Sequence, residues 1–312
     1  MKVTVTHTLN ARFVEIAEPS AEEFRDAGVL VRIETGVSDR HSFATVVCSG
    51  AVDDPVPSAA VESSLAHQLL VAADGRPLAE QKKIRTAWFY IETVLQRVGK
   101  TLRWRFGVFG DDSVFSSTRL DVALSDGAEV LELTPMPSAG MGDNIARIGA
   151  DGLRAVAELV GASVEQPLAH ELWRESWNLR HASPRSSLVV GVAAAEVGIK
   201  QLIALLVPDA EVLVEHLPSP PLTTLIHRVL PALPVKSGVQ ADRRCPQQIT
   251  KRIARAVEAR NLVVHRGATP AIDLRSTLLD IRDFLYLLDY HAGNSWALEL
   301  VSDRTKASLL AS

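Results

Sequence analysis

The stretch AVEARNLVVHRG, residues 256–267, decides how the second half of the chain is expected to fold. Its apolar residues continue an i, i+3, i+4 stripe that begins with the isoleucines upstream, so the segment is predicted to be an amphipathic helix. Gly267 is the residue type that commonly ends a helix in the left-handed conformation. The helix is therefore predicted to place Arg260, Asn261 and His265 together at its C-terminal end.

Helical spacing recurs on both sides of this stretch. Helices are predicted in NIARIGADGLRAVAELV, in LAHELWRESWNLRH, from Pro184 to about Leu206, near 221–230 and in a last segment that starts at Thr269–Pro270. Several helices joined by short connections are typical of a bundle. Residues 166–312 are therefore predicted to form an all-α helical bundle.

Residues 1–135 show a different pattern. Period-two alternation or β-branched residues predict strands in KVTVTHTL, GVLVRIE, SFATVVCS and TLRWRFGVF, and TRLDVALSDGAEVLEL is typical of a hairpin. An amphipathic helix is predicted from about Pro77 to Val98, with Gly99 ending it. The sequence thus predicts an α+β N-terminal domain, followed by a linker and a connecting helix over residues 136–165.

The composition is that of a folded protein, with 47% hydrophobic and 22% charged residues. A net charge of −4 gives no general attraction for nucleic acid or for a membrane surface, so a polyanion would need a local basic patch. The longest apolar run contains Glu196 and Lys200, which favours a buried helix over a membrane span. The N-terminus lacks the apolar core of a signal peptide, and Cys48 and Cys245 have no metal-ligand spacing, so a cytoplasmic protein with reduced thiols is expected.

The sequence contains partial matches to two nucleotide-binding motifs, and neither match is complete. RVGKT ends a predicted helix instead of opening one, and Val94 stands where a phosphate-binding loop requires glycine. GMGDNI is a partial dinucleotide motif in which Ile145 replaces the third glycine. The chain contains no GxSxG, HExxH or CxxC motif. No metal and no other cofactor is therefore expected.

Arg260 is the unusual residue of the 256–267 stretch. The apolar stripe places it in the core-facing register, where a charge is costly unless it is paired or opens into a cleft. Glu196 lies on the apolar stripe of an upstream helix and is expected to pair with Arg260 or to orient His265. A structural explanation stays open, because arginine and histidine near a helix C-terminus also interact favourably with the helix dipole.

The segment Arg260-Asn261-Leu262-Val263-Val264-His265 resembles the R-N-x-x-x-H motif of HEPN domains, which are helical bundles common among prokaryotic RNases, toxins and antiviral effectors. The setting is similar as well, because the family's motif lies where the penultimate main helix meets the loop before the last one. The family's upstream helix often carries an acidic residue among small apolar ones, as VAAAEVGIKQLI does with Glu196. The resemblance covers about residues 168–295 and leaves residues 1–135 without a role.

The resemblance implies a metal-independent RNA-cleaving site formed by Arg260, Asn261 and His265, with Glu196 in support. Histidine transfers protons near neutral pH, and a planar guanidinium binds two phosphate oxygens. One histidine cannot serve as base and acid in the same step, so the family's arrangement of two facing motifs implies a homodimer. RNA is expected to bind a basic face on the same helix, formed by Arg252, Arg255 and Arg266. His181 either lines the cleft or caps a helix.

The leading hypothesis is a metal-independent endoribonuclease of HEPN type in a toxin or phage-defence setting, with RNA as substrate. A regulatory protein or ligand is then expected to act on the N-terminal domain. The alternative is a non-catalytic HEPN-like bundle that serves dimerisation or nucleotide binding, with the motif in a structural role. A third hypothesis is a small-molecule enzyme built on the first domain, but residues 1–135 contain no catalytic motif in its favour.

Overall fold

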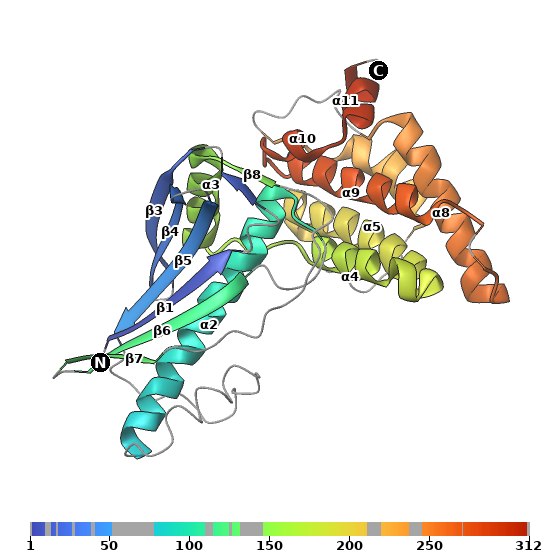
Figure 1. Cartoon of the computed structure of the whole chain (residues 1–312). Helices are drawn as coiled ribbons and strands as arrows, with labels where there is room; N and C mark the ends of the chain where they lie inside the picture. Colours follow the sequence, from blue (N-terminus) through green and yellow to red (C-terminus); the bar gives the residue numbers. More distant parts are fainter. Residues whose placement is uncertain are drawn as a thin grey trace. The chain divides into compact units, whose positions relative to one another are not determined.

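The computed structural model divides the chain into two compact units, Met1–Glu165 and Gln166–Ser312. The units are drawn in Figure 1. The structure describes residues 2–9, 14–16, 18–26, 29–38, 41–51, 78–109, 115–124, 127–131, 146–210, 220–236, 245–269 and 271–310.

The first unit is built around a six-stranded sheet in the order β3-β4-β5-β1-β6-β7, in which neighbouring strands are antiparallel. Two short strands, β2 and β8, form a separate parallel pair. The strands are β1 Lys2–Leu9, β2 Val14–Ile16, β3 Ser20–Asp26, β4 Val29–Ser38, β5 His41–Ala51, β6 Phe115–Leu124, β7 Gly127–Leu131 and β8 Ala146–Ile148. This confirms the predicted α+β character of the N-terminal region. The strands predicted in KVTVTHTL, GVLVRIE and SFATVVCS correspond to β1, β4 and β5, and the predicted hairpin is β6–β7.

Helix α2 spans Leu78–Phe106, and the strand predicted in TLRWRFGVF is therefore wrong. The helix passes through Gly99 and ends before Gly107, which adopts a left-handed φ of 62°. An interior glycine costs a helix only about 1 kcal/mol, and extending an existing helix is easier than starting a new element. The apolar residues of this segment, Leu102, Trp104 and Phe106, are buried in the helix. Their alternation fitted a strand because the helix is covered on more than one side.

Helix α3, Ala150–Gly161, packs against α2 and β3 and so belongs to the first unit. A Cβ at Gly152 would lie 2.6 Å from the Phe106 ring, so glycine is what lets α2 and α3 approach this closely. Residues 146–148, predicted to be helical, form β8 instead. The Pro- and Gly-rich linker TPMPSAGMG and the motif GMGDNI lie outside the described residues.

The second unit is helical throughout the residues that the structure describes. Its elements are α4 Leu168–Ala182, α5 Pro184–Leu206, η1 Pro208–Ala210, α7 Leu222–Thr224, η2 Leu225–Val229, η3 Leu230–Ala232, α8 Gln247–Arg266, α9 Leu274–His291, α10 Ala297–Leu300 and α11 Asp303–Leu310. The predicted helices at α4, α5, α7–η2 and α8 are confirmed. Helix α9 begins later than predicted, because the Asp273 carboxylate accepts a hydrogen bond from the Ser276 N–H and caps the helix there.

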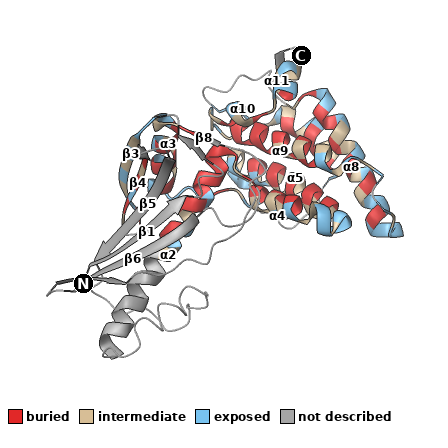
Figure 2. Ribbon diagram, in the orientation of Figure 1, coloured by how far each residue is buried: buried red, intermediate tan, exposed pale blue. Residues whose placement is uncertain are grey.

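Helix α5 forms the centre of this unit and packs against α4, α8 and α9. Figure 2 shows buried residues along the facing sides of these helices. A Cβ at Gly198 would lie 2.6 Å from a Leu285 methyl group, and one at Gly191 would lie 2.7 Å from Leu278, so small residues allow α9 to lie close. By length and composition α5 could cross a membrane, but half of its apolar window is buried inside the unit.

Two contacts show that α5 and α8 run antiparallel. The Arg260 guanidinium of α8 donates a hydrogen bond to Glu196 in the second half of α5. Arg185, at the start of α5, donates to the hydroxyl of Thr269, just after α8 ends. The N-terminal end of α5 therefore lies beside the C-terminal end of α8.

Helices α4 and α9 are also antiparallel. His170, in the first turn of α4, hydrogen-bonds to Asp289 near the end of α9. Trp173 donates from its indole N–H to the carbonyl of Leu278, near the start of α9. Helix α4 joins α5 through Ser183 alone. The ends of α4 and α8 and the beginnings of α5 and α9 therefore meet at one end of the bundle.

Candidate functional site

The Arg-Asn-His segment forms the last turns of α8. The helix runs through Arg266 and is closed by Gly267, whose φ of 62° places it in the left-handed region. The Gly267 N–H donates to the carbonyl of Val263 at 2.9 Å, and the next N–H reaches back to Leu262. This is the glycine-terminated helix end predicted from the sequence.

Arg260 and Glu196 are brought together as the sequence predicted. The Arg260 Nη2 donates a hydrogen bond to the Glu196 Oε1 at 2.7 Å. The two side chains are 26% and 34% exposed, so the pair lies at the edge of the α5–α8 contact and still reaches solvent. Because solvent screens such a pair, it contributes little to stability. The guanidinium is held in place without being sealed inside the bundle.

Asn261 and His265 lie on a more exposed side of α8. Both are exposed, and they are one helical turn apart. The helix advances about 100° per residue, so His265 is rotated by about 140° from Arg260 and lies about 7.5 Å further along the axis. No hydrogen bond joins the imidazole to the guanidinium among the described residues.

The helix end predicted at Gly267 is confirmed, but Arg260 and His265 do not converge within one chain. Because α8 stays helical through Arg266, the two side chains project from different sides of the helix. A site that uses both side chains on one phosphodiester would need a second copy of the motif.

Arg252 was expected to bind RNA, and the structure gives it a different role. Its Nε lies 3.0 Å from a carboxylate oxygen of Asp280, a residue of α9 that is 2% exposed. Arg304 of α11 pairs with the other oxygen of Asp280. Burial raises the pKa of the Asp280 carboxyl, while Arg252 and Arg304 partly oppose that shift. The Arg252 charge thus serves the packing of α8, α9 and α11.

Arg255 and Arg266 differ from Arg252 because both are exposed on α8. Neither forms an ion pair with a carboxylate in the part of the chain that the structure describes. The predicted basic face of α8 is therefore smaller than the sequence indicated. Arg266 lies in the last turn with His265, whereas Arg255 lies further back along the helix.

Two large apolar side chains next to the motif are exposed. Leu262 is 47% exposed and Val264 is 55% exposed, and they lie between Asn261 and His265 in the sequence. Exposed apolar residues that adjoin polar candidate site residues are typical of surfaces that contact another molecule. Sequence reasoning did not single them out, because helical spacing alone does not show which apolar residues remain uncovered.

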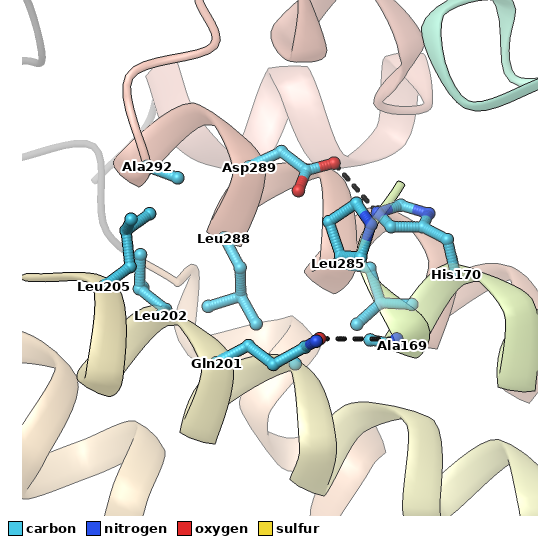
Figure 3. Close-up of a pocket in the computed structure, with 11 residues that line it drawn as sticks. Ala169, His170, Gln201, Leu202, Leu205, Leu285, Leu288, Asp289 and Ala292 are labelled. Carbon is cyan, nitrogen blue, oxygen red and sulfur yellow. Dashed lines mark hydrogen bonds and ion pairs between the residues drawn. The ribbon is translucent and has the colours of Figure 1, made fainter. Parts of the chain in front are cut away.

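A separate cavity of about 70 Å³ lies between α4, α5 and α9, and the motif residues do not line it (Figure 3). His170 and Asp289 are joined there by a 2.8 Å hydrogen bond between Nε2 and a carboxylate oxygen. The lining residues are Pro167, Ala169, His170, Gly198, Gln201, Leu202, Leu205, Leu285, Leu288, Asp289 and Ala292. They include no serine, threonine, cysteine or lysine that could act as a nucleophile beside the histidine.

The His170–Asp289 pair was missed from the sequence. Both residues fall on apolar helix faces 119 positions apart, so nothing local indicated that they meet. The pair is almost fully buried and links the first turn of α4 to the last turn of α9. The buried hydrogen bond between His170 and Asp289 thus joins these two helix ends.

Metal and thiol chemistry find no support among the described side chains. No three His, Cys, Asp or Glu side chains gather there in a way that could hold a metal ion. Burial raises the pKa of the Cys245 thiol to about 12, so the thiolate needed for nucleophilic attack is not populated at neutral pH.

Comparison of the chain with protein-family models, with curated proteins and with solved structures gives no match. The similarity to HEPN domains therefore rests on residues 260–265 and on their helical setting.

Proposed function

We propose that the protein is a metal-independent endoribonuclease of HEPN type that acts as a homodimer. The observation that supports this most directly is the Glu196–Arg260 contact, which holds a guanidinium at a solvent-accessible edge two turns before a glycine-terminated helix end. His265 is exposed at that same helix end. A cation for phosphate and a proton-transfer group are thus carried by one short segment of α8.

The proposed reaction is attack of a ribose 2′-hydroxyl on the adjacent phosphorus. A base removes the 2′-hydroxyl proton, the new P–O bond forms, and the bond to the 5′-oxygen breaks as an acid protonates that oxygen. The products are a 2′,3′-cyclic phosphate and a free 5′-hydroxyl, and no oxidant or reductant is needed. Histidine provides such proton transfers, each worth about 10²–10⁴-fold in rate, and the Arg260 guanidinium stabilises the negative charge that develops on phosphorus-bound oxygens.

A second copy of the chain supplies the second histidine that the proposed reaction needs. Within one chain Arg260 and His265 project from different sides of α8, so a single motif offers one imidazole away from the guanidinium. Two motifs related by a twofold axis would provide two histidines, one as base and one as acid. Leu262 and Val264 provide exposed apolar surface for that contact. In this proposal the neighbouring Asn261 donates to phosphate or holds His265.

The non-catalytic alternative has an observation of its own. The Arg260 Nε is buried and makes no hydrogen bond among the described residues, and a structural role of the Glu196 pair would account for a guanidinium held this way. In that case the bundle serves dimerisation or nucleotide binding. The two functions differ in what the His265 imidazole does, since an exposed histidine contributes little to folding.

The setting of the activity is part of the same proposal. A toxin or phage-defence RNase in the cytoplasm needs restraint, and the N-terminal α+β unit is the part of the chain on which a regulatory protein or ligand would act. No cofactor enters the proposed chemistry.

The deciding experiment measures cleavage of a fluorescent single-stranded RNA in EDTA by the full chain. Wild type is expected to cut, and His265→Ala to lose at least about 10²-fold of the rate while its circular dichroism and Tm are retained. His227→Ala, at another exposed histidine, is the matched control and should cut like wild type. Cleavage that needs added divalent metal, or an undiminished rate in His265→Ala, would contradict the mechanism, and a folded wild type that does not cut would favour the non-catalytic alternative.

A further inference from the structure

The end of the bundle that carries the motif gathers basic residues from four helices. It consists of the end of α4, the start of α5, the end of α8 and the start of α9, and we call residues 177–187, 262–269 and 271–277 the basic end. Within these segments the arginines are Arg180, Arg185, Arg266 and Arg275, and the histidines are His181 and His265.

The basic end is opposite in sign to the chain as a whole. Its only acidic residue is Asp273, whose carboxylate accepts hydrogen bonds from the Ser276 N–H and hydroxyl. The whole chain has a net charge of −4. A local positive surface on an acidic protein is the arrangement that lets one region bind a polyanion while the remainder repels it.

Four of these six basic residues have an explanation in helix stability. Arg180 and His181 lie in the last turn of α4, and His265 and Arg266 lie in the last turn of α8. The C-terminal end of a helix carries partial negative charge, which favours cations there. Arg180 also covers the Trp177 ring at 4.2 Å. These four residues alone would not indicate a ligand.

Arg185 and Arg275 have no such explanation. Each lies in the first turn of its helix, where the partial positive charge of the helix dipole disfavours a cation. Neither first turn contains an acidic residue, although the carboxylate of Asp273, the N-cap of α9, attracts Arg275 electrostatically. Both side chains are exposed, and neither has an ion-pair partner within 4 Å in the part of the chain that the structure describes. Arg185 donates only one long hydrogen bond of 3.4 Å, to Thr269.

We propose that the basic end is the RNA-docking surface, with Arg185, Arg266 and Arg275 holding backbone phosphates of a single strand. This inference rests on the proposed function, because it names where the substrate of that site binds. It replaces the expected face of Arg252, Arg255 and Arg266, of which Arg252 is taken up by Asp280. The RNA then passes over the α4–α5 turn and meets the last turns of α8, where Arg260 and His265 lie.

The test measures RNA binding separately from cleavage. A labelled single-stranded RNA is titrated with the His265→Ala protein, which leaves the RNA intact, and fluorescence anisotropy gives Kd at several salt concentrations. The double variant Arg185→Glu/Arg275→Glu is compared in this background with Arg228→Glu/Lys251→Glu. The second pair makes the same change in charge on exposed residues of η2 and α8 that lie outside the basic end.

Reversal of charge in the basic end is expected to raise Kd by about tenfold or more and to flatten the dependence of log K on log salt by about 1.4, as for two lost phosphate contacts on a single strand. The Arg228/Lys251 pair should change Kd by less than about twofold. Glutamate in a first turn suits the helix dipole, so Arg185→Glu/Arg275→Glu should keep or raise Tm while it weakens binding. If these arginines only stabilised the fold, their replacement would not weaken RNA binding while it keeps or raises Tm.

Equal or larger weakening by Arg228→Glu/Lys251→Glu, or an unchanged Kd in the basic-end variant, would overturn the docking surface and leave the proposed function standing. Loss of binding only in the basic-end variant, together with no cleavage by wild type, would support the surface and refute the proposed function. Arg185→Gln/Arg275→Gln provides a milder version, for which a Kd increase of about threefold is expected.

Discussion

Two arginines on α8 were both expected to act on RNA, and the structure separates them. Arg252 pairs with Asp280, which is 2% exposed and also bound by Arg304. Arg260 pairs with Glu196, and both side chains keep a quarter to a third of their exposure. The same helix therefore carries one ion pair inside the packing of α8, α9 and α11 and another at an edge open to solvent.

The difference shows how to tell a structural charge from one available for function. A buried carboxylate such as Asp280 requires its partner, because an unpaired charge in the interior is strongly unfavourable. A pair at the edge of two helices is screened by water and is worth little to folding. A position that costs stability little to change, yet holds a guanidinium in one place, is where a functional role becomes the better explanation.

The largest expected effect is on stability at Arg252. Arg252→Met keeps the length of the side chain and removes the charge, which leaves Asp280 buried with only Arg304, and the free energy of unfolding should fall by about 3 kcal/mol. Arg260→Met should cost less than about 1 kcal/mol. Urea unfolding of the two variants measures the contrast directly. Equal losses would show that the two ion pairs are not different in kind.

A smaller effect is expected at Glu196. Glu196→Gln keeps the shape of the side chain and weakens its hold on Arg260, so the unfolding free energy should change by less than about 1 kcal/mol. RNA cleavage should fall by about ten- to a hundredfold, because the guanidinium is no longer fixed where the phosphate binds. The matched control is Glu258→Gln, at an exposed carboxylate of α8. If both variants cut at the wild-type rate, Glu196 does not position Arg260.

The smallest expected effect is the pH dependence of stability at Asp273, in the basic end of the bundle. Hydrogen bonds from the Ser276 hydroxyl and N–H hold the pKa of the Asp273 carboxyl below its ordinary 3.8. The stabilisation from this carboxylate is therefore present above pH 3.8 and is lost as the pH falls through the lowered value. Asp273→Asn keeps a capping side chain and removes only the screened charge, so near pH 6 its free energy of unfolding should be lower than that of wild type by less than about 1 kcal/mol, and the difference should shrink below pH 3.8. A difference that stays constant down to pH 2 would contradict this assignment.

The helical half of the molecule was largely predictable, because its elements follow local rules. The i, i+3, i+4 stripes identified α4, α5 and α8, and Gly267 gave the correct end of α8. The start of α9 was misplaced because Asp273 competes with the Thr269–Pro270 signal, and a side-chain cap decides the matter. The error in α2 has a similar origin, since the alternation of Leu102 and Trp104 is compatible with a helix covered on two sides.

The candidate site was predictable only in part. The pairing of Glu196 with Arg260 followed from two apolar stripes, since each charge continued a buried face. The partners of Arg252 and His170 depend on contacts between distant helices, which spacing along the chain does not encode. The prediction placed Arg260, Asn261 and His265 together at the end of α8, but five residues of helix rotate His265 by about 140° away from Arg260.

The most direct test of the account exchanges the two charges of the edge pair in the double variant Glu196→Arg/Arg260→Glu. If the pair only joins α5 to α8, the exchanged pair does so as well, whereas a guanidinium that acts on phosphate from α8 is lost. The account predicts an unfolding free energy within about 1 kcal/mol of wild type and RNA cleavage at least about 10²-fold slower. Cleavage at the wild-type rate by a folded exchange variant would contradict the claim that Arg260 works in catalysis.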